Sequence, residues 1–217
     1  MIRMIAEPEA AEFPEHLVLE GVSWSLYQKL LRETRERRLY MTYDEGRLEI
    51  MAPLPEHEKT KKFIGGFIEL ISLERNIPMC RLGNTTFHRK KLAKGLEPDE
   101  CYYIQHEEDV RGKKRLRLGI DPPPDLVVEV DVSYRAINRE RIYAKMGVLE
   151  IWHHDRSGLR GLRLGSDEQY KVIQKSLAFP FLKISDIARF LDMFDEHDEL
   201  TVFRSFRDWI REIPHSH

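Results

Sequence analysis

Hydrophobic residues recur at helical spacing in several parts of the chain, and each part predicts a helix. The strongest pattern lies in EHEKTKKFIGGFIELISLERN, residues 56–76, where Phe63, Ile64 and Phe67 fall on one side. The shorter patterns cover residues 24–38, residues 184–191 and a stretch from Ser133 or Asn138 to Gly147. Gly147 follows the last periodic residue and therefore suits a helix C-cap.

Apolar or alternating segments between these helices predict strands. Residues 39–42 and 47–51 flank the turn YDEG, in which Gly46 supplies the permissive backbone of a hairpin. The other predicted strands are residues 85–89, 101–104, 126–132, 148–155, 158–164 and 168–174, the last two at sheet edges. The order of helix, hairpin, long helix, three strands, helix and strand predicts one mixed α/β domain.

Length and composition place limits on this domain. The 217 residues suit one domain, which we expect over residues 17–195. A loosely held arm (1–16) should precede it, and an amphipathic extension (196–217) should follow. The chain is 41% hydrophobic and 33% charged, and no stretch approaches the roughly 18–20 apolar residues of a membrane span. These values exclude a membrane protein.

Two features indicate a reducing compartment. Cys80 and Cys101 lie far apart and form no CxxC motif. The N-terminal residues MIRMIAEPEA lack an uninterrupted apolar run after a basic start. We therefore expect no signal peptide and a cytoplasmic location.

The net charge of -2, from 35 basic and 37 acidic residues, does not by itself favour nucleic acid. Basic residues are nevertheless concentrated in RKKLAK (89–94) and RGKKRLR (111–117). Two solvated loops would explain these stretches. A role in following a nucleic-acid backbone is the alternative.

The segment PPPDLVVEVDV carries the clearest chemical signal. Because side chains alternate on a strand, Asp125, Glu129 and Asp131 share one face and the valines at 128 and 130 share the other. A covered strand would require a cation or basic partner for the acids. The alternative is an edge strand whose acidic face lies in water.

A second acidic cluster, EPDE at residues 97–100, begins another predicted strand. Alone, Asp99 would be taken for a turn residue. If its strand pairs with that of Glu129, then Asp99, Glu129 and Asp131 converge on one point. Three carboxylates suit Mg²⁺ or Mn²⁺, which prefer hard oxygen ligands and retain several waters.

Three blocks of the sequence carry a family resemblance. They are EPD at 97–99, PPDLVVEV at 123–130 and the spaced residues Arg139, Tyr143, Gly147, Val148, Glu150 and Trp152. Over roughly residues 17–195 the chain resembles the Uma-type restriction endonucleases, a branch of the PD-(D/E)xK nuclease superfamily. The resemblance implies a restriction-endonuclease-like core, with a central mixed sheet flanked by helices, and a metal-dependent endonuclease acting on DNA.

The superfamily motif places an acid on one strand and an acid-x-lysine on the next, so the resemblance assigns Asp99 and Glu129 to these acids. Asp125 lies too far along the strand from Glu129, about 13 Å by strand rise, and is expected only to begin the strand. Asp131 stands where the superfamily has lysine, and it would be an additional metal ligand. The family typically supplies a lysine four residues before the tyrosine, where this chain has Arg139.

Arg139 would hold the scissile phosphate, because arginine binds phosphate bidentately but is a poor proton shuttle. The general base stays open. Lys145 is a possible substitute, although its direction on the helix predicts that it faces solvent. The superfamily also uses an acid from the first core helix, and either Glu56 or Glu58 could fill this role.

The helical direction of Glu56 matches that of Phe63 and Phe67, whereas Glu58 points nearly opposite to Phe67, so Glu56 and its neighbour His57 are better placed to reach inward. The alternative for each acid is a favourable charge at a helix N-terminus.

Other chemistries find little support. His153 and His154 are adjacent and point to opposite faces of a strand, and no HExxH motif exists, so zinc is disfavoured. No GxSxG, Walker A or Rossmann fingerprint occurs. The leading hypothesis is a Mg²⁺- or Mn²⁺-dependent DNA endonuclease using Asp99, Glu129 and Asp131.

Two alternatives remain. One is a nucleic-acid-binding module of nuclease fold that is catalytically impaired because it lacks the strand lysine. The other is a structural or interaction protein, for example a homodimer formed through the apolar residues of VFRSFRDWI.

Overall fold

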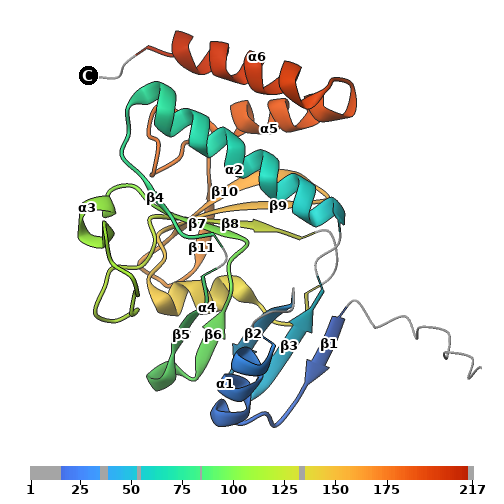
Figure 1. Ribbon diagram of the computed structural model, residues 1–217, viewed down its shortest axis with the longest axis vertical. Helices are drawn as coiled ribbons and strands as arrows, with labels where there is room; N and C mark the ends of the chain where they lie inside the picture. Colours follow the sequence, from blue (N-terminus) through green and yellow to red (C-terminus); the bar gives the residue numbers. More distant parts are fainter. Residues whose placement is uncertain (1–15, 35–38, 53–54, 84, 132–134, 215–217) are drawn as a thin grey trace, which may run out of the picture.

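A computed structural model describes residues 16–34, 39–52, 55–83, 85–131 and 135–214 (Figure 1). The predicted N-terminal arm, apart from His16, lies outside these residues. The helices are α1 (Trp24–Glu33), α2 (Pro55–Arg75), α3 (Glu107–Val110), α4 (Arg139–Met146), α5 (Ile184–Asp192) and α6 (Glu199–Glu212), with short 3-10 turns η1 (Lys90–Leu92) and η2 (Met193–Asp195). Each predicted helix is present, with ends shifted by a few residues.

The strands form two sheets. The five-stranded sheet has the order β1-β3-β2-β6-β5 and consists of β1 (His16–Leu19), β3 (Arg47–Met51), β2 (Tyr40–Asp44), β6 (Lys94–Leu96) and β5 (Phe87–Arg89). The six-stranded sheet has the order β11-β10-β9-β8-β7-β4 and consists of β11 (Tyr170–Ile173), β10 (Gly158–Leu164), β9 (Glu150–Asp155), β8 (Leu126–Val130), β7 (Glu100–Tyr103) and β4 (Cys80–Arg81). The mixed α/β prediction is confirmed.

The hairpin of β2 and β3 forms where the YDEG turn predicts it. Glu45 and Gly46 both have positive φ, at 49° and 99°, a conformation that glycine adopts without strain. Of the two strands predicted at sheet edges, only β11 lies at an edge. The prediction for β10 is wrong, since β10 pairs with both β9 and β11.

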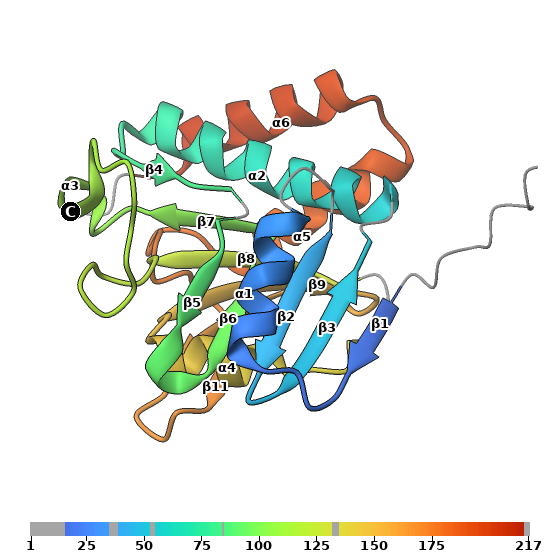
Figure 2. The ribbon, with the colours of Figure 1, turned by 60° about the horizontal axis from the view of Figure 1, so that its bottom comes forward.

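The six-stranded sheet lies between two layers of helices (Figure 1). One core contains α2, α5, α6 and the side chains of Leu126, Val128 and Val130. The opposite core contains Val127 and residues of α4. The five-stranded sheet forms a core of its own with α1 (Figure 2), while Phe87 of β5 and Leu96 of β6 join the core of α4. Strand β8 is therefore buried on both faces, and the edge-strand alternative is excluded.

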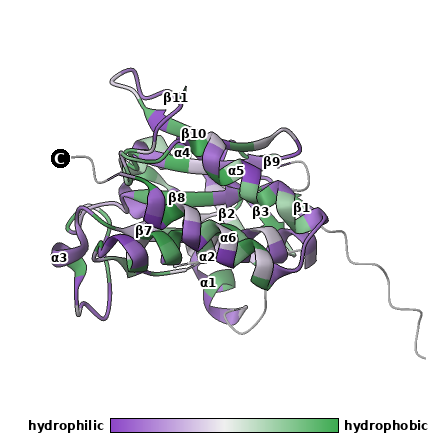
Figure 3. Cartoon of the chain, turned by 90° about the horizontal axis from the view of Figure 1, so that it is seen from above, coloured by the Kyte–Doolittle hydropathy of each residue, from purple (hydrophilic) through white to green (hydrophobic). Residues whose placement is uncertain are grey.

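Helix α2 is buried on two sides. Its Phe67 ring stacks on Phe206 of α6, with 4.2 Å between centroids, and Phe63 stacks on Phe194 of η2. Figure 3 shows α6 lying over α2. Because Phe206 and two further apolar residues of α6, Val202 and Ile210, are buried against this layer, they are not available for the homodimer suggested by the sequence.

No helix among the described residues is both long enough and apolar enough to cross a membrane.

Candidate functional site

The register of β7 and β8 brings the first two acids together. These strands pair antiparallel, with Glu100 opposite Val128. Asp99, directly before β7, therefore meets the end of β8, and its Oδ2 accepts a hydrogen bond of 2.8 Å from the backbone N–H of Val130. The strand pairing on which the proposed site depends is confirmed.

Asp99 is fully buried, and its two oxygens differ. Oδ2 contacts Val130 and lies 3.0 Å from Nε2 of His57, whereas buried Oδ1 has no hydrogen-bond partner among the described residues. Burial alone would raise the pKa of Asp99, but the hydrogen bond and the charge of His57 outweigh it and lower the pKa. Asp99 is therefore a carboxylate with one oxygen, Oδ1, available to bind a ligand.

Glu129 on β8 has a similar asymmetry. Its Oε1 accepts hydrogen bonds from the Tyr143 hydroxyl and from Nη2 of Arg139 at 2.7 Å. Its Oε2 is buried and meets no hydrogen-bond partner in the part of the chain that the structure describes. Burial raises the pKa of Glu129 to about 7, against the lowering effect of Arg139, and the charge of Asp99 contributes to the rise. A bound cation would favour the ionised form.

Arg139 begins α4, and its charge is already neutralised. The helix starts there because Asn138 caps it, accepting a hydrogen bond from the N–H of Arg141. Both terminal nitrogens of Arg139 are engaged: Nη2 with Glu129, Tyr143 and the carbonyl of Glu97, and Nη1 with the Thr42 hydroxyl. The arginine holds Glu129 in position here. Its role as a phosphate clamp stays a prediction.

Asp131 does not join the other two acids. It follows the end of β8, where its Oδ1 pairs with Nε of Arg135 and its Oδ2 lies 2.9 Å from Nε2 of His153. Burial would raise the pKa of Asp131, but the hydrogen bond to His153 and the charge of Arg135 outweigh it and lower the pKa. Within the described residues, no three His, Cys, Asp or Glu side chains are grouped to hold a metal ion. The expected convergence of three acids is thus corrected to a pair.

His153 comes to this position from β9. The parallel pairing of β8 and β9 places it opposite Glu129. Burial would lower the pKa of His153, but hydrogen bonds to Asp131 and Glu140 outweigh it and raise the pKa to about 9. The sequence pattern raises His153 only as a zinc ligand, although the predicted strand of residues 148–155, next along the chain after that of Glu129, could have placed it here.

The helix α2 contributes His57, whereas Glu56 is exposed and has no hydrogen bond or ion pair with the three acids within the described residues. The expectation for Glu56 is corrected for a geometrical reason. Glu56 was aligned with Phe63 and Phe67, and this side of α2 packs against the C-terminal helices. Glu58 instead accepts a hydrogen bond from Lys61.

Lys61 and Tyr40 were not recognised from the sequence. The Lys61 ammonium is buried and donates hydrogen bonds to Glu58 and to the Tyr40 hydroxyl, at 2.8 and 2.9 Å. Burial would lower the pKa of Lys61, but these two hydrogen bonds outweigh it and raise the pKa. Lys61 is therefore a buried cation beside the His57–Asp99 pair.

The remaining candidates lie away from the acid pair. Asp125 accepts backbone N–H groups of Ile104 and His106, which confirms it as a residue that begins the strand. Lys145 pairs with Glu168 at the surface, as its predicted outward direction requires.

Neither basic stretch reaches the acid pair. In the first, Lys94 is buried with Asp44 and Glu45, and Arg89 lies at the C-terminal end of α4, where it donates to the Lys145 carbonyl. The second stretch precedes the start of β8 rather than its end (Figures 1 and 2). DNA binding by these stretches stays a prediction.

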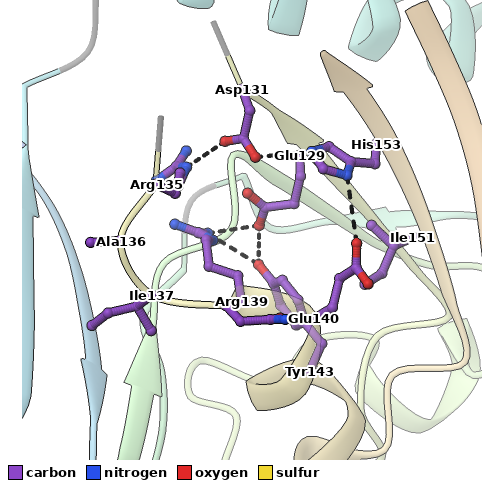
Figure 4. Close-up of a pocket in the computed structure, with 11 residues that line it drawn as sticks. Glu129, Asp131, Arg135, Ala136, Ile137, Arg139, Glu140, Tyr143, Ile151 and His153 are labelled. Carbon is purple, nitrogen blue, oxygen red and sulfur yellow. Dashed lines mark hydrogen bonds and ion pairs between the residues drawn. The ribbon is translucent and has the colours of Figure 1, made fainter. Parts of the chain in front are cut away.

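A pocket of about 410 Å³ opens beside Glu129 (Figure 4). It is lined by Glu129, Asp131, Arg135, Ala136, Ile137, Asn138, Arg139, Glu140, Tyr143, Ile151 and His153. Its volume lies in the range of about 300–1,000 Å³ that is usual for small-molecule sites. The pocket therefore extends from Glu129 to Asp131 and the two partners of Asp131, Arg135 and His153.

Residues 24–189, well over half of the chain, match the family described as "Uma2: Putative restriction endonuclease". This chain belongs to the Uma2 family. The family resemblance noted in the sequence is thereby confirmed, and the six-stranded sheet between helical layers is its restriction-endonuclease-like core.

One solved structure similar to this Uma2 chain is a "putative nuclease belonging to DUF820" from Anabaena variabilis. The two share 14% sequence identity, with a TM-score of 0.46, over 77% of this chain and 90% of the other. No curated protein matches this chain.

Proposed function

We propose that this protein is a Mg²⁺- or Mn²⁺-dependent endonuclease that hydrolyses phosphodiester bonds in DNA. The observation that carries the proposal is the pair of unpartnered oxygens, Oδ1 of Asp99 and Oε2 of Glu129, both buried. A buried polar atom without a partner is costly. Two such oxygens, one directly before β7 and one on the adjacent strand β8, therefore indicate a bound group.

The donor set fits such a metal. Mg²⁺ is commonly held by one or two carboxylates and keeps several waters, so a pair of acids is sufficient. Asp99 and Glu129 would hold the ion. When bound, it would lower the pKa of a water and neutralise charge that develops on the phosphate oxygens.

The surrounding residues prepare these two acids. His57 and the Val130 N–H fix the Asp99 carboxylate by hydrogen bonds to its Oδ2. Arg139 and Tyr143 fix Glu129 through its Oε1. Each acid is thereby oriented with its second oxygen available, and loss of such a partner typically costs about 10–100-fold in metal affinity or activity.

The test is nicking of supercoiled plasmid by the purified protein with Mg²⁺ or Mn²⁺. Asp99→Asn and Glu129→Gln should each lower the cleavage rate by about 10³-fold, because several kcal/mol of metal stabilisation is lost. The matched control is Glu108→Gln, an exposed residue of α3, which should cleave at the wild-type rate. Full activity in both acid variants would disprove the site.

A second candidate is a nucleic-acid-binding module without cleavage activity. It is favoured by the arginine at 139 and by Asp131, which stands at the superfamily's lysine position and is paired with Arg135. DNA binding that is independent of metal, with no nicking under any of these conditions, would support this candidate over the nuclease.

A further inference from the structure

Arg135 differs from Arg139 in how its guanidinium is used. The Arg135 side chain is only 7% exposed, and its Nε pairs with Asp131. Within the described residues, its buried Nη2 has no hydrogen-bond partner, whereas Arg139 has both terminal nitrogens engaged and only its Nε without a partner. Arg135 lines the pocket of about 410 Å³, and its Nη2 is a covered donor that no group of the described residues uses.

Two further features place positive potential in the same pocket. His153 lies on its wall and is held by the other oxygen of Asp131 (Figure 4). Residues 136–138 lead into α4, so the N-terminal end of that helix, with its partial positive charge, also faces the pocket. The two basic side chains and the helix end come from different parts of the fold.

The acids on the wall are largely compensated. Glu129 is paired with Arg139 and Tyr143, and Asp131 is paired with both Arg135 and His153. Glu140 is the third acid, and its side chain is 43% exposed. An anion that enters the pocket therefore meets paired carboxylates, two arginines that each have one guanidinium nitrogen without a partner among the described residues, and a helix N-terminus.

We propose that this pocket is a subsite for a phosphodiester of the bound DNA strand, contacted by Arg135 and held in shape by Asp131 and His153. Asp131 is then a positioning residue, which explains why an acid stands where the superfamily has lysine. The inference rests on the proposed function, because the strand reaches the pocket only if its scissile phosphate lies at Asp99 and Glu129.

The experiment measures binding of a short fluorescent duplex by anisotropy across a series of salt concentrations. It is run with Ca²⁺ and with a chelator, and gels check that the duplex stays intact. Arg135→Gln should weaken binding by about ten-fold and reduce the slope of log affinity against log salt by about 0.9, as expected for one lost phosphate contact. The matched control Arg204→Gln, at an exposed site on α6, should retain the wild-type affinity and slope.

A second variant guards against misfolding. Arg135→Gln leaves the Asp131 charge partly unpaired, so the double variant Arg135→Gln/Asp131→Asn removes both charges. It should bind DNA as weakly as the single variant. Circular dichroism at the assay temperature checks that it is folded, because loss of the Asp131–His153 pair lowers its stability. A wild-type salt slope in either folded variant overturns the subsite.

A separate arm distinguishes the source of the phosphate. Inorganic phosphate is titrated into the wild type and Arg135→Gln by calorimetry. If Arg135→Gln loses phosphate binding but keeps the wild-type slope for DNA, the pocket is a free-anion site and the proposal is overturned.

The outcomes also separate this inference from the proposed nuclease. A wild type that cuts DNA, with Arg135→Gln unchanged in slope, overturns the subsite alone. A wild type whose DNA binding depends on Arg135 but that never cuts DNA with Mg²⁺ or Mn²⁺ supports the subsite and overturns the nuclease. A wild type that binds no DNA overturns both.

Discussion

The two acids at opposite ends of β8 have different surroundings. Asp125, directly before the strand, has both oxygens engaged: Oδ2 accepts two backbone N–H groups and Oδ1 lies 2.5 Å from Nδ1 of His106. Glu129, near the end, has one oxygen engaged and one without a partner. Asp125, whose two oxygens are both engaged, fixes the segment of Ile104 and His106 to the start of β8. Glu129 keeps one oxygen available for a ligand.

Burial alone does not mark a functional acid. Both residues are less than 10% exposed; Asp125 directly precedes the buried strand β8 and Glu129 lies on it. What separates them is the number of lone pairs that the fold has used. Native proteins leave few buried polar atoms unpaired, so the exceptions are the candidates for function.

The largest expected difference is in metal binding. Glu129→Gln should weaken Mn²⁺ binding by more than about 100-fold, since it removes a ligand outright. Asp125→Ala should bind Mn²⁺ as the wild type does, because its oxygens face Ile104 and His106. Isothermal titration calorimetry measures both. Equal losses of Mn²⁺ affinity in the two variants would show that the number of engaged oxygens does not distinguish a metal-binding acid from a structural one.

For the free energy of unfolding we expect the opposite order, with a larger effect at Asp125 than at Glu129. Asp125→Ala leaves the buried N–H groups of Ile104 and His106 without an acceptor, which should lower the free energy of unfolding by about 2–3 kcal/mol. Urea unfolding followed by circular dichroism measures the change. Asp109→Ala, at an exposed site on α3, is the control and should change stability by less than about 0.5 kcal/mol. A loss no greater than that of the control would contradict the role given to Asp125.

A smaller effect should separate neighbours on α2. His57→Gln removes the imidazole that orients Asp99, so Mn²⁺ affinity should fall by about ten-fold, as is usual for partners of metal ligands. Glu56→Gln should have a smaller effect, because Glu56 is exposed. The same titration compares them, and an effect of Glu56→Gln equal to or above that of His57→Gln would restore Glu56 to the site.

The smallest effect is the pH dependence of the Asp131–His153 pair. Because the pKa of His153 is raised from 6.5 to about 9, its charged form stabilises the fold fully below pH 6.5, and this stability is lost as pH rises through 9. Asp131 has a lowered pKa, so its contribution is present above pH 3.8 and lost at lower pH. The groups facing His153 are Asp131, Glu140 and Glu129.

Thermal unfolding of the wild type and His153→Gln measures this dependence. The difference in their stability should be greatest between about pH 4 and 6.5 and should become small above pH 9. A difference that does not change from pH 6 to 10 would show that the histidine charge does not stabilise the fold.

Much of the fold follows from local pattern. The apolar period of residues 56–76 predicts α2, and Gly147 predicts the end of α4, because short-range spacing sets a helix and its ends. The sequence left the start of α4 open between Ser133 and Asn138, and the structure has Asn138 as its N-cap. The strand β6 (Lys94–Leu96) was missed, since three residues at the end of a basic run carry no alternation. Its pairing with β2 and β5 is a long-range contact.

The site was predictable where neighbouring strands set it. Asp99 and Glu129 meet because β7 and β8 pair, which a motif on consecutive strands can indicate. Arg135 and His153 were missed because they approach Asp131 from opposite directions, one from the segment before α4 and one from β9. Glu56 was misplaced because α2 has two buried sides, and the sequence does not tell which side faces the sheet.

The C-terminal helix sets a boundary that differs from the family match. The match ends at residue 189, but Arg75 of α2 donates to the carbonyls of Ile210 and Ile213, at 3.3 and 2.7 Å. A chain shortened to residue 189 would leave Phe67 facing water where Phe206 now covers it. The unit that matches the family by sequence is therefore smaller than the unit that closes the hydrophobic core.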